Sequence, residues 1–158
     1  MPVLNVLCTC ERVIIDAKGI PSLISLFQRM DLQLTDTPFP EDAVAPARWV
    51  VFSMWQLSPE EVGREFIQHT KIIRPNGVVM HEATQPFRVQ SDSDLHIRTY
   101  MELNGMFIGQ EGFYRIQVWL EAEEVHEISF FIKHIPVAQP SEVAQLNLAA
   151  AAEQEATA

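Results

Sequence analysis

The sequence predicts an all-β protein, an antiparallel β-sandwich of seven to eight strands with a C-terminal Ala-rich tail. Three observations predict this class: apolar and polar residues alternate over short stretches, turn-forming residues separate the stretches, and helical periodicity is rare before residue 137. With 158 residues, 47% of them hydrophobic, the chain is long enough for one domain with its own core. We expect a β-sandwich domain over residues 1–136 and a tail over residues 137–158.

The first expected strand and the second form a hairpin. Apolar residues at even positions of the first strand alternate with polar residues at Asn5, Thr9 and Glu11, which indicates one buried face. These even positions are Leu4, Val6, Cys8, Cys10 and Ile14. Residues 16–19, Asp-Ala-Lys-Gly, are typical of a turn. Even-numbered apolar residues then continue from Ile24 to Leu34 and predict a single second strand.

The middle of the chain predicts a crossing between sheets and then a buried strand. Residues 36–46 hold three prolines and three acidic residues, so they predict a loop long enough to cross from one sheet to another. Residues 48–57 are apolar at both parities, as in a central strand covered on both faces. Ser58-Pro59 indicates a short helical start. Residues 63–74 then fit either a strand or the end of a helix over 59–69.

The third quarter of the chain contains the clearest turn. Asn76-Gly77 suits the positive φ values of a tight hairpin. Strands over 78–82 and 87–90 flank Pro86, which we expect at a sheet edge or bulge because proline cannot donate to a ladder. The strand over 95–103 alternates well, and Asn104-Gly105 is expected to end it.

The last two strands have the most regular alternation. Residues 114–120 and 128–132 predict a hairpin with one buried face, closed by Pro136. The tail after it contains eight alanines, three glutamates and no Lys or Arg. Because isolated helices of this length are marginal in water, we expect a frayed helix or disorder, with a helix docked on a partner as the alternative.

Several short segments resemble, in their order along the chain, a bacterial family of small single-domain proteins described only as a domain of unknown function. These segments are Cys10-Glu-Arg-Val-Ile-Ile-Asp16-Ala-Lys-Gly19, Leu26-Phe27, Phe39-Pro40 before Trp49-Val50-Val51, Pro75-Asn76-Gly77, and Gly112-Phe113-Tyr114. The resemblance implies a compact antiparallel β-sandwich over residues 8–132. It implies no established activity and supplies no catalytic residue.

The charge balance excludes some partner classes. Against 11 Lys and Arg stand 21 Asp and Glu, which gives a net charge of -10. Nucleic acid and anionic membranes require a basic surface, so neither is expected as a partner. The first residues lack the basic region and the small-residue cleavage site of a signal peptide, and the longest dense apolar run, residues 49–55, is far shorter than a membrane helix. We therefore expect a soluble, cytoplasmic protein.

No motif predicts a catalytic, metal or cofactor site. Cys8 and Cys10 share one face of a strand and read as buried structural thiols, because one Cys-x-Cys supplies at most two of the four ligands of structural zinc. The five histidines are scattered, and a metal site would need a ligand from another strand, such as His96. Asp92 and Asp94 read as solvated turn residues, with calcium binding as the alternative.

The candidate binding residues are Trp119, Arg115 and Tyr100, all at polar positions of their strands. A tryptophan beside an arginine is a common composition of protein interfaces. Trp119 is therefore expected either to form an interface or to be covered by a loop or the tail.

Three functions fit these observations. The first is a non-catalytic binding or assembly module that recognises a protein partner or a second copy of the chain. The second is a hydrolase or lyase that uses histidines and carboxylates. The third is a carbohydrate-binding domain that uses Trp119 and Tyr100. The absence of a catalytic motif favours the first, and the sequence leaves open whether the protein is an enzyme.

Overall fold

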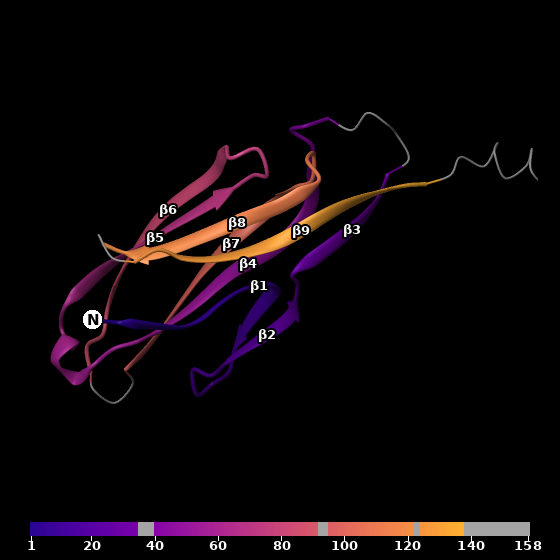
Figure 1. Cartoon of the computed structure of the whole chain (residues 1–158). Helices are drawn as coiled ribbons and strands as arrows, with labels where there is room; N and C mark the ends of the chain where they lie inside the picture. Colours follow the sequence, from indigo (N-terminus) through magenta and orange to yellow (C-terminus); the bar gives the residue numbers. More distant parts are fainter. Residues whose placement is uncertain (35–39, 92–94, 122–123, 138–158) are drawn as a thin grey trace, which may run out of the picture.

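Two β-sheets pack against each other in the computed structural model (Figure 1), which describes residues 1–34, 40–91, 95–121 and 124–137. Sheet A has the strand order β2-β1-β4-β7, and sheet B the order β3-β9-β8-β5-β6. The strands are β1 (Val3–Ile15), β2 (Pro21–Leu26), β3 (Arg29–Leu34), β4 (Val44–Gln56), β5 (Glu65–Ile73), β6 (Val79–Arg88), β7 (His96–Phe107), β8 (Gly112–Leu120) and β9 (His126–Pro136). The all-β sandwich is confirmed, with nine strands instead of seven or eight.

One hydrophobic core joins the two sheets. Its aromatic centre brings Trp49 of sheet A against Phe130 of sheet B, with ring centroids 5.6 Å apart and nearly perpendicular planes. Tyr114 stacks on the same Phe130 at 5.3 Å, and Phe27 meets its edge at 5.6 Å. Such edge and offset contacts follow the ring quadrupole. Aromatic side chains from both sheets therefore contact one another in this core and hold the sheets together.

The first hairpin is confirmed, but the second expected strand is two strands. Asp16 Oδ1 accepts hydrogen bonds from the amides of Lys18 and Ile20, both 2.8 Å long, and fixes the turn between β1 and β2. After β2 the chain leaves sheet A. The Phe27 amide still donates a hydrogen bond of 3.2 Å to the Thr9 carbonyl of β1. Strand β3 then pairs with β9 of sheet B in parallel. The apolar alternation continues through this crossing, so it could not reveal the break.

A bulge in β1 reverses the face that its side chains occupy. Pairing with β4 shifts register between Leu4 and Val6, so Leu4 and Leu7 pack against the core. Val6, Cys8 and Cys10 lie on the outer face instead, which corrects the expectation that all even positions face the core. Cys10 is nevertheless fully buried, Cys8 is half-buried, and both are free thiols.

Strand β4 is the central strand that the sequence predicts, although it is longer. It begins at Val44, inside the expected loop, and pairs with β1 on one side and β7 on the other. Trp49 and Val51 enter the core, while Val50 and Phe52 are buried on the opposite face. Both faces of this strand are therefore covered, as expected.

A 3-10 helix over Pro59–Glu61 confirms the short helical start, and the longer helix over 59–69 is wrong because β5 begins at Glu65. Asn76-Gly77 forms the β5–β6 turn, where Gly77 has φ +85° and the Asn76 side chain accepts the Val78 amide (3.1 Å). Pro86 lies in β6, an edge strand, as predicted, but β6 is continuous through it.

Strand β7 also runs further than predicted. It continues past Asn104-Gly105 to Phe107, because Gly105 adopts φ +95° at an irregular register between β7 and β4. The β8–β9 hairpin is confirmed, with Ile116 and Ile132 fully buried on its inner face. The expected calcium alternative at Asp92 and Asp94, and nearly all of the tail over 137–158, lie outside the described residues.

Candidate interaction surface

The outer face of sheet B carries the candidate site. The even-numbered residues of β8, from Tyr114 to Leu120, are buried in the core, so its odd-numbered residues point away from the core. Strands β5 and β9 flank β8 and present their own odd-numbered residues beside them. We name this surface the Trp119 face; it comprises Ile67, His69, Lys71, Phe113, Arg115, Gln117, Trp119, Glu127, Ser129 and Phe131.

Trp119 is half-buried by its neighbours on β5. The His69 imidazole lies opposite it in register and stacks on the indole with ring centroids 5.1 Å apart and an angle of 11° between the planes. Lys71 Nζ lies 5.4 Å from the indole centroid and 3.3 Å from the Glu82 carboxylate of β6. The stack and the cation restrict the indole to one orientation.

Arg115 lies four residues before Trp119 on the same face of β8. Its guanidinium is 3.7 Å from the Glu127 carboxylate, which also accepts a hydrogen bond of 2.8 Å from Gln117 Nε2. These exposed contacts add little to stability, since surface ion pairs contribute about 0–1 kcal/mol. Their main effect is to place a polar row along the middle of the face.

An aromatic pair lies at the far end of the Trp119 face. Phe113 is 61% exposed and meets the ring of Phe131 edge-on at 4.8 Å. The face therefore has aromatic groups at both ends and charged groups between them. Phe113 was not among the predicted binding residues, although it shares the parity of Arg115 and Trp119, a signal that could have revealed it.

Tyr100, the third predicted binding residue, lies elsewhere. It belongs to β7 of sheet A, where it is opposite Phe52 and 48% exposed. Trp119 and Arg115 share one face of sheet B, so the structure brings two of the three candidates together and leaves Tyr100 on the other sheet.

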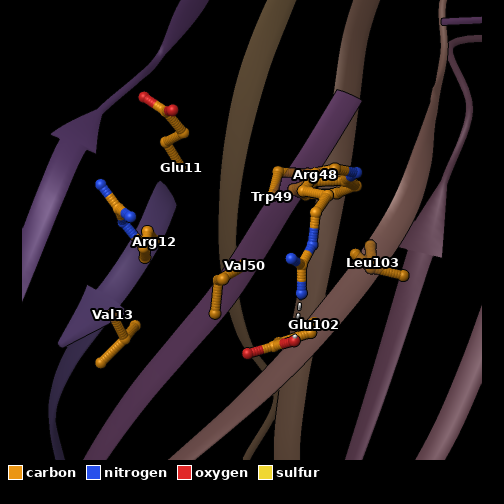
Figure 2. Close-up of a pocket in the computed structure, with 8 residues that line it drawn as sticks. All are labelled: Glu11, Arg12, Val13, Arg48, Trp49, Val50, Glu102 and Leu103. Atoms are coloured by element: carbon orange, nitrogen blue, oxygen red, sulfur yellow. Dashed lines mark hydrogen bonds and ion pairs between the residues drawn. The ribbon is translucent and has the colours of Figure 1, made fainter. Parts of the chain in front are cut away.

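A cavity of about 350 Å³ lies on sheet A where β1 separates from β4. The β1–β4 pairing ends at Cys10 and Val50, after which β1 pairs only with β2. Figure 2 shows Arg48 extending toward Glu102, 3.2 Å away, while Arg12 lies across the gap on β1. Two acidic and two basic side chains line the cavity, and Arg48 is highly exposed. The lining therefore does not favour a ligand of either charge.

A buried polar cluster lies inside the sandwich. Gln68 Oε1 accepts hydrogen bonds from Trp55 Nε1 (2.6 Å), Thr99 Oγ1 (2.8 Å) and Ser53 Oγ (2.9 Å). The Gln68 amide nitrogen donates to Thr70 Oγ1 (3.3 Å). Because the polar atoms satisfy one another, the cluster connects the two sheets as a structural element.

The cysteines and the histidines are distributed over several strands of both sheets. Burial, with the neighbouring Cys10, raises the pKa of Cys8 to about 11, which keeps this thiol protonated at neutral pH. His126 packs edge-on against Trp55, and His134 Nε2 lies 2.7 Å from the Ile108 carbonyl. Among the described residues, no group of three or more His, Cys, Asp or Glu could hold a metal ion. No helix in the described ranges is long and apolar enough to span a membrane.

The fold and this surface define a protein of the β-sandwich class. The chain belongs to the family of unknown function DUF6941, whose model matches residues 5–133. No curated protein matched the chain. Among solved structures it is similar to part of a β-glucosidase from Listeria innocua in complex with glucose, with 7% sequence identity and a TM-score of 0.44. That similarity covers 87% of this chain and 16% of the enzyme chain.

Proposed function

We propose that the protein is a non-catalytic binding or assembly module that recognises a protein partner through the Trp119 face. The observation that carries this proposal is the half-buried Trp119 held between His69 and Lys71, with Arg115 on the same strand. Tryptophan and arginine are the residues most enriched among those that dominate binding energy at protein interfaces. The acidic net charge of -10 disfavours nucleic acid as this partner.

The arrangement of the face supports this role. An indole already fixed by a stacked imidazole loses little conformational freedom on binding, so less affinity is lost to ordering. The exposed Phe113 ring adds apolar area about one strand length away. A cytoplasmic location belongs to the same proposal, because both cysteines are free thiols.

The other two functions have weaker support. Among the described residues, no group of three or more His, Cys, Asp or Glu could hold a metal ion, so a metal-dependent hydrolase or lyase has no support from these ranges. Trp119 and Tyr100 lie on different sheets, so they do not form one aromatic platform for a sugar.

The test is affinity capture from native lysate with the full chain and its variant Trp119→Ala, quantified by mass spectrometry. We expect a protein that binds the unaltered chain and is lost with the variant, since truncating such a tryptophan weakens binding by roughly 30-fold or more. Leu26→Ala is the control, because Leu26 is 63% exposed on β2 of the other sheet. Identical capture by all three proteins, with the folds shown equal by circular dichroism, would refute the proposal.

A further inference from the structure

Strand β7 is an unusually open sheet edge. The sandwich has four edge strands, and three of them are short or interrupted by proline: β2 and β3 have 6 residues each, and β6 contains Pro86. β7 has 12 residues and no proline, and on its outer side no strand of the described chain pairs with it. A long edge with unpaired backbone groups is a template for another strand, and proteins usually protect such edges.

The sequence of β7 is complementary to itself when two copies run antiparallel. Suppose that Tyr100 faces Tyr100 of the second copy across a two-fold axis. Each residue of one copy then lies opposite a residue of the second copy such that their two residue numbers add up to 200. Arg98 then lies opposite Glu102 twice, once on each side of the axis. Moving the centre to residue 98 or 102 would oppose two like charges, which destabilises a strand pair.

From this register we propose that two copies of the chain form a symmetric dimer by pairing β7 with β7, which makes one continuous eight-stranded sheet from two copies of sheet A. Self-complementary contact about a two-fold axis is the commonest form of homo-oligomer. This inference concerns sheet A and does not depend on the proposed role of the Trp119 face.

The exposure of β7 fits this pairing. Tyr100 and Glu102 are 48% and 56% exposed, so both are accessible to a second copy. On the core side, the same register places Ile97 opposite Leu103 and Thr99 opposite Met101 of the second copy, and three of these four side chains are apolar.

Glu102 can bind an arginine of the second copy in addition to its partner within the chain. Glu102 uses Oε2 to bind Arg48, an exposed ion pair that leaves the other carboxylate oxygen for Arg98 of the second copy. Arg98 Nη1 contacts the carbonyl of His96 within its own chain at 3.4 Å, and Arg98 shares the parity of Tyr100 and Glu102 along β7.

The oligomeric state of the full chain tests the proposal, measured by sedimentation velocity up to ~100 µM, a range that detects weak dimers. We expect the unaltered chain to dimerise. Glu102→Arg places arginine opposite arginine twice and should weaken the dimer roughly 10- to 100-fold. Mixing the Glu102→Arg chain with an Arg98→Glu chain should restore it as a heterodimer, because both cross-strand pairs are then opposite in charge.

Two further variants make the test decisive. Glu121→Arg is the matched control, since Glu121 also pairs with an arginine, Arg64 at 3.2 Å, but lies outside both β7 and the Trp119 face, and it should leave the dimer intact. Tyr100→Glu places two carboxylates on the axis and should give a monomer even if Arg98→Glu fails to fold. A monomeric unaltered chain, or a dimer that survives both Glu102→Arg and Tyr100→Glu, would overturn the proposal.

Discussion

Gln68 is the residue on which the buried polar cluster depends. Its side-chain oxygen accepts the indole hydrogen bond of Trp55, and both residues are buried, so water cannot take its place. Ser53 and Thr99 can still bond to each other if Gln68 is lost. Loss of Gln68 therefore leaves Trp55 Nε1 without its acceptor and Thr70 Oγ1 without its donor.

Replacing Gln68 by leucine should lower the free energy of unfolding by about 2–3 kcal/mol, because the buried indole N–H is left unsatisfied. Urea denaturation followed by circular dichroism measures this change. The control is Gln117→Leu, where the amide bonds an exposed carboxylate on the Trp119 face and the expected change is within ~0.5 kcal/mol. Equal effects of the two substitutions would contradict a structural role for the cluster.

At the scale of single elements, two glycines are required for different reasons: one for its backbone conformation, the other because a side chain has no space there. Gly77 needs only its positive φ in the β5–β6 turn and has open space around it. A Cβ on Gly109, in contrast, would lie 2.1 Å from the Glu41 carbonyl oxygen and 2.4 Å from that of Pro40. The connection between β7 and β8 therefore packs directly on the backbone that precedes β4.

We expect Gly109→Ala to destabilise the protein by about 3 kcal/mol or more, since two backbone segments must move apart. Gly77→Ala should cost about 1 kcal/mol, the usual effect of a side chain at positive φ in an open turn. Chemical denaturation of both variants measures the difference. A Gly109→Ala protein as stable as Gly77→Ala would show that the loop contact can relax without cost.

Elements joined by local signals were predictable, and those set by distant contacts were not. The Asp16 and Asn76-Gly77 turns act through neighbouring residues, so their hairpins followed from the sequence. The bulge after Leu4 depends on register against β4, and apolar residues at both Val6 and Leu7 hide the change of face. The crossing at Phe27 also gives no signal in the sequence. The apolar residues of β2 and β3 keep one parity, although the two strands belong to different sheets.

The residues of the candidate site were likewise only partly predictable from the sequence. Strand parity placed Trp119 and Arg115 on one outer face, since alternation along β8 is a local property. It could not place Tyr100, because the sheet to which a strand belongs is decided by pairing over long sequence distances. His69 and Lys71 were missed for the same reason, since β5 meets β8 only through register.

At the scale of the whole molecule, the strands and core residues that the structure describes all lie before residue 137. The core residues run from Leu4 to Ile132, and the last described backbone hydrogen bond joins the Val137 amide to the Leu34 carbonyl (3.0 Å). Because both sheets contribute to this one core, they should unfold together. The division into a domain over 1–136 and a tail after it is therefore a proposal about stability.

We expect a chain truncated after Val137 to unfold in one transition, with a melting temperature within ~2 °C of the full chain, since it keeps every core residue of the described ranges. Differential scanning calorimetry of both chains measures this. Truncation after Phe131 is the opposing control: it removes Ile132, fully buried in the core, and the β9 residues that pair with Met30–Leu34, so that chain should not fold. A marked loss of stability after truncation at Val137 would mean that the tail contributes to the folded domain.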